Sequence, residues 1–437
     1  MAAVESRTSE QHGGGPVITV TTTVPAAGGT FVARHEGRVV FVRGSAPHET
    51  VTARVIDDPS GLDGARFWRA ETVDVLEPSV DRVPTVWPEA GTDGVGGADW
   101  AHIALPAQRR IATDVLRELL QRAKVTSFPL DDVQVEPAPH DEDGLGWRTR
   151  VRLAVDERGR VGMRGWRSHE VRPVGENPLA APAIRALALT SWTPPAGTEA
   201  IDAVAPSADE PAVVIIGRDL DPGDVSIPEG WGAAHVAVQN SSGLHVVRGA
   251  ETVRERVGDQ ELVVGVTGFW QVHRDAASLL ADVVERDLAA RPGDSVWDLY
   301  GGVGLFAARI GRTTGLDGEV VSVEGNKRAG RLAQQNLADV PGASARTSDA
   351  TDFVREQRRG ADRVVLDPPR AGAGAELIEL LAERVRERIV YVSCEPSTLA
   401  RDLAIAEQKG WRIEDLRAFD LYPHTHHIET VVVLERD

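Results

Sequence analysis

The sequence predicts an α/β protein with three parts: a small N-terminal β-barrel, a mixed β-rich central domain and a C-terminal doubly wound domain. Two patterns lead to this prediction. Short runs of alternating apolar and polar residues fill residues 16–83, as in half-buried strands. From residue 261 onward strands alternate with helices, which is typical of a parallel sheet covered on both faces. The length of 437 residues suits about three domains.

The overall composition limits where this chain works. Residues 1–15 are polar and glycine-rich without an apolar core, so they predict a disordered tail and no signal peptide. No run approaches the roughly 18 apolar residues that a membrane span needs, and the single cysteine excludes an internal disulfide. We therefore expect a cytoplasmic monomer without a membrane partner. The net charge of −18 argues against nonspecific coating of nucleic acid.

The first part, residues 16–83, predicts a small barrel. Glycine and proline separate five short strands, at residues 17–20, 30–34, 38–42, 50–55 and 71–76. Five short strands in about sixty residues are typical of an antiparallel barrel. This barrel is either a structural cap or an oligonucleotide-binding module, and the pattern alone does not decide between them.

Residues 84–260 combine a linker, a helix and a central domain. The linker, residues 84–99, is rich in glycine, proline and aspartate. Residues 107–124 predict a helix, because their apolar side chains recur on one face. In the β-rich remainder, the strand at residues 148–155 carries arginines on one face. That face could contact RNA phosphates, although solvated charges at a sheet edge are the commoner explanation.

The C-terminal part, residues 261–437, predicts a doubly wound α/β domain. We expect strands at residues 295–300, 319–324, 361–366, 389–392, 412–419 and 428–434, and helices at 327–337, 376–384 and 397–408. In this fold class the ligand lies beyond the carboxyl ends of the strands.

A glycine-rich segment, DLYGGVG at residues 298–304, follows the first of these strands. Its glycines allow a close backbone approach to a ligand, although an ordinary strand–helix turn would look the same. Glu324 ends the next strand, where a carboxylate can hold ribose hydroxyls, and Asp349 is placed to meet an adenine. Because Ala307 replaces the last glycine of a dinucleotide loop, S-adenosylmethionine fits better than NAD.

The DPPR segment at residues 367–370 ends another strand. Its two prolines keep the backbone extended and remove two donors. The segment is therefore expected to be stiff and to present Asp367 to the site, although a rigid turn alone would also explain it.

The only cysteine, Cys394, lies in SCEPST at residues 393–398, beyond a strand end and just before a helix. An unpaired cysteine is by default an inert core residue. This position differs, because a helix N-terminus is expected to lower the pKa of the thiol. The sequence therefore favours Cys394 as a nucleophile.

The HTHHIET segment at residues 424–430 leads into the last strand. Its histidines suggest a metal site, but adjacent strand residues point to opposite faces and no further thiolate or close carboxylate completes a ligand set. We therefore expect no metal. Alternation instead places His427 and Glu429 on one face, so that Glu429 can act as a base.

These parts suit methylation of a uracil carbon. Uracil C5 is a poor nucleophile until a thiolate adds at C6, and a base must later remove the C5 proton. The reaction needs a nucleophile, a base and a methyl donor together, and Cys394, Glu429 and the glycine-loop site supply them. The target base must also leave its stack.

The segments at residues 298–304, 367–370, 393–402 and 423–430 resemble the motifs of the RNA uridine-C5 methyltransferase family. Likewise GRVVFV at residues 37–42 and VLEPS at 75–79 are similar to the TRAM domain. The resemblance implies a TRAM-like barrel at 16–83, a central RNA-binding domain within 84–260 and a Rossmann-like class I methyltransferase domain at 261–437. It implies Cys394 as nucleophile and Glu429 as base. The S-adenosylmethionine contacts that it implies are Gln271, Tyr300, Glu324, Asp349 and Asp367.

The chain departs from the family pattern at several positions. Gly301 stands in place of a cysteine, His273 in place of an asparagine, and Leu305 in place of a polar residue that contacts the cofactor. Many relatives carry an iron–sulfur cluster on cysteines. The corresponding positions here are Trp87, Val95, Ala98 and Asn177, so we expect no cluster, because thiolates are its ligands.

Two other functions remain open at this stage. Amino-group methyltransferases use Asp-Pro-Pro followed by an aromatic residue, but Arg370 occupies that position and Cys394 would have no role. An inactive RNA-binding factor could also keep this fold. We favour ribosomal RNA over transfer RNA as the substrate, because a TRAM barrel is commoner among the ribosomal RNA enzymes. Because the barrel lies far from every catalytic motif in the sequence, we expect it to supply RNA affinity and no chemistry.

Overall fold

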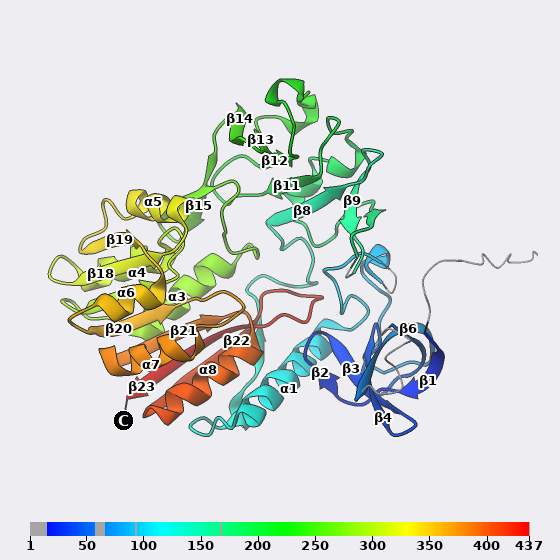
Figure 1. The fold of residues 1–437 in the computed structure, drawn as a ribbon, viewed down its shortest axis with the longest axis horizontal. Helices are drawn as coiled ribbons and strands as arrows, with labels where there is room; N and C mark the ends of the chain where they lie inside the picture. The colour runs from blue at the N-terminus through cyan, green and yellow to red at the C-terminus, as the bar shows by residue number, and fades with distance from the viewer. Residues whose placement is uncertain (1–14, 57–65, 92–93, 167, 437) are drawn as a thin grey trace, which may run out of the picture.

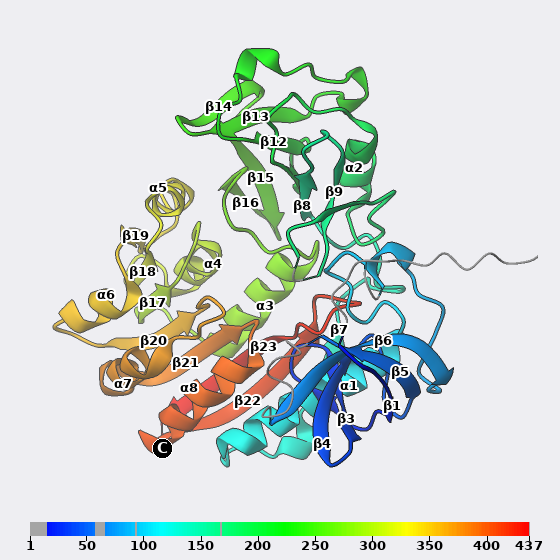
Figure 2. The ribbon, with the colours of Figure 1, turned by 45° about the vertical axis from the view of Figure 1, so that its right-hand side comes forward.

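The computed structural model describes residues 15–56, 66–91, 94–166 and 168–436. All but the last residue of the predicted disordered tail, 1–15, lies outside these residues. Four sheets organise the described chain, and Figures 1 and 2 show the barrel in blue, the central domain in green, and the C-terminal domain in yellow to red. The α/β fold class is confirmed. Among the described residues, no helix is long and apolar enough to cross a membrane.

The N-terminal barrel is a six-stranded sheet with the order β1-β5-β6-β4-β3-β2. Its strands are β1 (Val17–Thr21), β2 (Pro25–Ala26), β3 (Thr30–His35), β4 (Arg38–Arg43), β5 (Thr50–Val55) and β6 (Phe67–Glu77). Backbone hydrogen bonds from Thr23 N to Val32 O and from Val32 N to Val24 O connect the segment after β1 with β3. The prediction of five strands missed β2, because two residues carry no alternating pattern.

The central domain is built on a seven-stranded sheet with the order β10-β9-β8-β11-β12-β13-β14. Its strands are β8 (Arg150–Val155), β9 (Val161–Arg164), β10 (Val171–Pro173), β11 (Ala200–Val204), β12 (Ala212–Ile216), β13 (His235–Asn240) and β14 (Gly243–Arg248). The short helix α2 (Pro182–Arg185) contributes Ile184 to an apolar core with buried residues of β8, β11 and β12.

The C-terminal domain holds an eight-stranded sheet with the order β19-β18-β17-β20-β21-β23-β22-β7. Its strands are β17 (Ser295–Leu299), β18 (Glu319–Glu324), β19 (Ala343–Thr347), β20 (Ala361–Leu366), β21 (Val385–Ser393), β22 (Trp411–Asp420), β23 (Glu429–Arg436) and β7 (Val135–Pro137). The neighbouring strands from β19 to β21 are parallel, whereas β23 is antiparallel to both β21 and β22.

Helices cover both faces of this sheet. They are α3 (Ala276–Leu288), α4 (Leu305–Thr314), α5 (Lys327–Asn336), α6 (Ala350–Glu356), α7 (Gly374–Arg384) and α8 (Pro396–Gln408). Two apolar cores result, one shared with α6, α7 and α8 and the other with α3 and α4. The switch in strand order between β17 and β20 is where such a fold opens a ligand crevice.

The structure divides residues 84–260 differently from the prediction. Helix α1 (Leu105–Ala123) lies beside α8 (Figure 1), and its apolar face belongs to the core of the C-terminal sheet. Strand β7 pairs with β22 at the edge of that sheet. The predicted boundary at residue 261 also cuts a hairpin, β15 (Thr252–Val257) with β16 (Gln260–Gly265). The apolar side chains of this hairpin are buried with those of α3 and α4.

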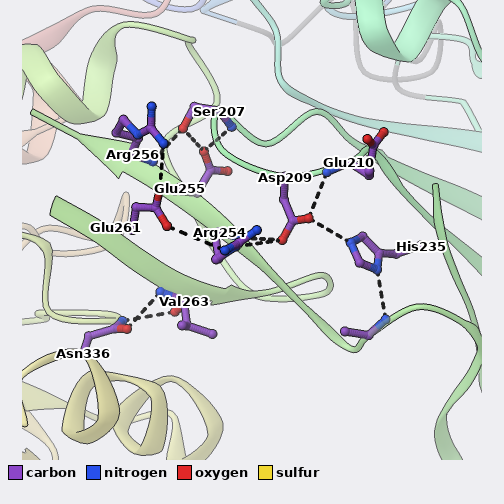
Figure 3. A network of polar contacts seen from close by, with 11 residues as sticks. Ser207, Asp209, Glu210, His235, Arg254, Glu255, Arg256, Glu261, Val263 and Asn336 are labelled. Atoms are coloured by element: carbon purple, nitrogen blue, oxygen red, sulfur yellow. Dashed lines mark hydrogen bonds and ion pairs between the residues drawn. The ribbon is translucent and has the colours of Figure 1, made fainter. Parts of the chain in front are cut away.

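A polar network connects this hairpin to the central domain (Figure 3). Asp209 lies at its centre, with its carboxylate 3.2 Å from His235 Nε2 of β13 and 3.4 Å from Arg254 Nε of β15. Close by, Ser207 donates to the buried Glu255 of β15 at 2.8 Å. These side-chain contacts therefore join the central domain to the hairpin β15–β16, which packs against helices of the C-terminal domain.

Candidate active site

A cavity of about 760 Å³ lies beyond the carboxyl ends of β17, β18, β20 and β21. Its volume lies within the range of small-molecule sites, roughly 300–1,000 Å³. Six of the seven side chains that the sequence singled out line it: Gln271, Tyr300, Glu324, Asp367, Cys394 and Glu429. The fold therefore brings residues from six separate segments to one place.

The glycine loop fits closely against the end of β17. Asp298 is fully buried there and accepts a hydrogen bond from Ser322 Oγ at 3.0 Å. A Cβ atom at Gly301 would lie 2.1 Å from Ser322 Oγ and 2.7 Å from Asp298 Oδ2, so a side chain is excluded. Gly302, with φ of 56°, donates its backbone N–H to Glu324 at 3.0 Å. The glycines thus allow the loop to approach the cavity as bare backbone.

Glu324 ends β18 with its carboxylate at the cavity. One oxygen accepts from Gly302 N and the other from Asn326 N at 2.6 Å. Carboxylates accept further hydrogen bonds through their remaining lone pairs. Glu324 can therefore fix the glycine loop and still receive ribose hydroxyls.

This arrangement gives a binding prediction for Glu324→Ala. A hydrogen bond to a charged group is worth roughly 1.5–3 kcal/mol, so we expect the Kd for S-adenosylmethionine, measured by calorimetry, to rise about 10- to 100-fold. Glu319→Ala, at the exposed start of the same strand, is the matched control and should bind as the wild type does. Equal Kd values for both variants would remove Glu324 from the binding site.

Asp349 does not line the cavity, in contrast to the expectation. Its Oδ1 accepts from Thr351 N at 2.8 Å and from Asp352 N at 3.1 Å, so it caps α6. Aspartate at this position satisfies backbone donors that the helix leaves open. Its charge still acts nearby, because burial first and then Asp349 raise the pKa of Tyr300 to about 12.

Leu305 and His273, two of the positions that depart from the family pattern, do not line the cavity. Leu305 is buried at the start of α4 in the apolar core. His273 stacks on Trp147 with ring centroids 5.7 Å apart, and burial lowers its pKa to about 4. Neither substitution adds a side chain to the cavity lining.

Cys394 lies half-buried at the cavity, one residue before the cap of α8. The expected lowering of its pKa is wrong for this arrangement. Burial, followed by the carboxyl groups of Glu429 and Asp367, raises the pKa of the Cys394 thiol to about 12, and the opposing effect of Arg370 is smaller. Burial and the two acidic neighbours together favour the protonated thiol at neutral pH.

Glu429 begins β23 and is 2 % exposed. Burial and the nearby Asp367 raise its pKa to about 8, against a hydrogen bond of 2.8 Å that Tyr422 Oη donates to it. Burial, followed by the charge of Asp298, likewise raises the pKa of Asp367 to about 7. A carboxyl group with a pKa near neutrality suits a general base, which must both accept and release a proton.

Several further residues line the cavity that the sequence analysis did not assign to the site. Arg148 and Arg370 bring positive charge, Phe269 is 74 % exposed at the cavity, and Tyr422 and His427 lie beside Glu429. Burial lowers the pKa of Arg148. The sequence had shown Arg148 as one of a row of strand arginines. The three arginines make different contacts, since Arg148 lines the cavity whereas Arg150 and Arg152 bind other residues of the protein.

Arg150 and Arg152, the next two arginines of that strand, make structural contacts within the protein. Arg150 Nη1 donates to Gly268 O at 2.7 Å, which fixes the loop before Gln271. Arg152 pairs with Asp202 at 2.6 Å on the exposed side of the sheet. Only one of the three arginines is therefore directed at the cavity.

The three histidines of the last motif have three different partners. His424 is hydrogen-bonded to Gln108 and to Asp143 O. His426 contacts Asp99, and His427 contacts Arg370. Within the described ranges, no cluster of His, Cys, Asp and Glu is arranged to hold a metal ion.

Comparison with known proteins identifies the family. The sequence profile of the tRNA (Uracil-5-)-methyltransferase family matches residues 346–437, and that of the TRAM domain matches residues 14–61. An uncharacterized RNA methyltransferase of Streptomyces avermitilis is 40 % identical over 424 residues, covering 94 % of this chain and 96 % of that protein. One of Bifidobacterium longum is 35 % identical over 423 residues, covering 93 % and 94 %.

The chain belongs to the tRNA (uracil-5-)-methyltransferase family. It is an S-adenosylmethionine-dependent RNA methyltransferase with an N-terminal TRAM domain. The tRNA (uracil-54, C5)-methyltransferase of Pyrococcus abyssi, solved with S-adenosyl-L-homocysteine, shares the fold with a TM-score of 0.72 at 22 % identity. The match covers 95 % of this chain and all of that one. The cavity lies beyond the carboxyl ends of the parallel strands, where folds of this class bind their ligands.

An apolar cluster occupies the positions at which the family resemblance implied cluster-binding cysteines. Trp87, Val95 and Ala98 are each at most 2 % exposed and pack together with Trp147 and Leu179. Asn177, at the fourth position, accepts a hydrogen bond from the backbone N–H of Leu179 through its Oδ1 at 3.0 Å. These side chains fill the space and offer no thiolate.

We therefore expect the purified enzyme to contain far less than one equivalent of iron per chain. Its absorbance spectrum should show no iron–sulfur band in the visible range. Metal analysis by mass spectrometry and an absorbance spectrum of anaerobically prepared protein measure this. One equivalent or more of iron with matching sulfide would contradict the prediction, because a single cysteine cannot bind a cluster.

Proposed function

We propose that this RNA uracil-5 methyltransferase works through a covalent adduct between Cys394 and C6 of the target uracil, with Glu429 as the base. The observation that supports this is that the only thiol and a deeply buried carboxyl share one cavity with the glycine loop. An amino-group methyltransferase would have no use for the thiol, and Arg370 occupies the place of its aromatic residue.

The chemistry runs in three steps. The Cys394 thiolate adds to C6, and the electrons of the C5–C6 double bond make C5 nucleophilic. C5 then attacks the sulfonium methyl group of S-adenosylmethionine, the S–CH3 bond breaks, and S-adenosylhomocysteine leaves. Finally Glu429 removes the C5 proton, the C5–C6 double bond forms again and the Cys394 sulfur leaves. The base ends as 5-methyluracil, and the enzyme regains the Cys394 thiolate with the C5 proton on Glu429.

The charges around the thiol govern its activation. With pKa values of about 12 for Cys394 and about 8 for Glu429, both groups are protonated at neutral pH in the free protein. A positive charge within about 4–6 Å favours the ionised forms of both. Arg370 already acts in this direction on Cys394, and a bound sulfonium would add to it. The thiol is thereby kept inert until the site is filled.

The RNA substrate is a further part of the proposal. We favour ribosomal RNA, on the ground that a TRAM barrel precedes the catalytic domain. Transfer RNA is the second candidate, because the Pyrococcus abyssi protein whose whole chain matches this fold acts on tRNA. The half-buried Arg148 and the exposed Phe269 at the cavity suit a base that has left its stack.

Mapping of 5-methyluridine tests both the proposed reaction and the proposed RNA substrate. Ribosomal and transfer RNA from cells with and without this protein are digested and measured by mass spectrometry. Loss of 5-methyluridine at one ribosomal position supports the preferred substrate, and loss only from transfer RNA replaces it with the second. A methyl group lost from an exocyclic nitrogen instead would favour the amino-group reaction.

A further inference from the structure

The N-terminal barrel directly contacts the catalytic loop, residues 421–428. Figures 1 and 2 show this red loop extending from the C-terminal sheet toward the blue barrel. A Cβ at Gly29, in the turn between β2 and β3, would lie 3.1 Å from the His426 ring. Trp100 joins the same contact, since its Nε1 donates to Gly29 O at 3.4 Å and its backbone N donates to His424 O at 2.9 Å. The barrel is therefore distant from this loop in the sequence but adjacent to it in the structure.

A buried ion pair fixes this contact. Asp99 lies between the barrel and the loop, with Oδ1 3.6 Å from Arg43 Nε of β4 and Oδ2 2.9 Å from His426 Nδ1. The side chains of Arg43 and Asp99 are 6 % and 10 % exposed. Burial alone would raise the pKa of Asp99, but His426 and Arg43 outweigh burial and hold that pKa below its usual value. Asp99 is therefore a carboxylate with two defined partners.

Arg43 is itself held by the rest of the protein. Its Nη1 lies 3.1 Å from Glu71 of the neighbouring strand β6. Its guanidinium stacks 4.4 Å from the ring centroid of Trp166 in the central domain. The side chain that orients Asp99 is thus fixed by the barrel and the central domain together.

From His426 the contacts continue into the active site. The rings of His426 and His427 lie 4.3 Å apart. His427 lines the cavity, and its Nε2 lies 3.3 Å from Arg370 Nη2. Burial, followed by the charges of His426 and Arg370, lowers the pKa of His427 to about 3. His427 is therefore a neutral acceptor that holds Arg370 at the cavity, and Arg370 is the cation that favours the Cys394 thiolate.

We propose that the barrel is a working part of the active site, and that Asp99 is a positioning residue for methyl transfer. Through His426 it fixes His427, and through His427 it fixes Arg370 beside the nucleophile. This inference rests on the proposed role of Cys394. It assigns to the barrel a contribution to the rate of reaction, beyond any contribution to RNA affinity.

Asp99→Asn tests the inference with little change in shape. The amide still reaches His426 but no longer pairs with Arg43 by charge. Since a 1 Å misplacement at a reacting centre can cost about 10²-fold, we expect kcat at saturating RNA to fall by about 10- to 100-fold. The Kd for S-adenosylmethionine should stay within about twofold of the wild type, because Asp99 does not line the cavity.

The chain offers a matched control in Figure 3. Asp209 also holds a histidine and an arginine, His235 and Arg254, but none of these lines the cavity. Asp209→Asn removes the same charge from a similar cluster and should keep wild-type kcat. Thermal melting of both variants shows that each is folded, and kcat is referred to the folded fraction.

A double substitution sharpens the test. Arg43→Met should lower kcat as Asp99→Asn does, and the double variant should be no slower than the slower single one, because both act through His426. A wild-type kcat for Asp99→Asn, with only the KM for RNA raised, would overturn the inference and leave the barrel as an affinity module. Absence of 5-methyluridine formation by the wild-type enzyme would instead refute the proposed function.

Discussion

Cys394→Ala is expected to abolish methylation and to leave S-adenosylmethionine binding intact. The substitution removes the atom that adds to C6, and without that addition C5 stays too weakly nucleophilic to take a methyl group. Cys394 is the only cysteine, so no other thiol can replace it. The measurement is 5-methyluridine formed from substrate RNA and tritiated cofactor, together with a denaturing gel for the protein–RNA adduct.

Two observations make this result interpretable. Unchanged cofactor affinity by calorimetry shows that the cavity is still formed. Wild-type protein treated with iodoacetamide should lose activity with one alkyl group per chain, slowly at pH 8 because the pKa of the free thiol is about 12. An adduct formed by Cys394→Ala would mean that another residue is the nucleophile.

Glu429→Gln is expected to trap the enzyme on its RNA. Addition and methyl transfer do not need the base, but the C5 proton then has no acceptor and the sulfur cannot leave. Loss of a positioned base costs roughly 10²–10⁴ in rate. This variant should therefore accumulate a methylated adduct that survives denaturing electrophoresis, whereas the wild type passes through it quickly.

Glu435→Gln serves as the control, because it lies near the far end of the same strand and pairs with Arg388 and Arg412. It should release free product at the wild-type rate. Release of 5-methyluridine at that rate by Glu429→Gln would assign the proton to another acceptor. The candidates on the cavity wall are then Asp367 and His427.

Local patterns were sufficient for most of the fold. Helices α5, α7 and α8 begin and end within about two residues of their expected bounds, because the apolar residues of an amphipathic helix recur in adjacent turns and can be recognised from the local sequence. Strand β7 was not predicted. Its three residues carry no alternation, and they form a strand only because β22 offers an open edge.

The candidate active site was predictable where motifs follow strands. Cys394, Asp367 and Glu324 come directly after or at the ends of parallel strands, whose carboxyl ends share one edge. Arg148 is positioned by isolated backbone bridges to Ala180 and His273, contacts that no local pattern encodes. The thiol pKa could not be predicted either, because it depends on two carboxyl groups that are distant in sequence.

The edge position of β7 affects how the chain folds during its synthesis on the ribosome. Arg417 of β22 pairs with Glu136 of β7 across 281 residues of sequence. Helix α1 and β7 leave the ribosome long before their partners exist, so the apolar face of α1 stays uncovered during synthesis. Such distant pairing slows folding and exposes surfaces that aggregate. A fragment that begins at residue 261 would lack this segment and leave β22 as an open edge. We therefore expect the catalytic domain to fold only when residues 105–137 are present, in the same chain or as a separate peptide.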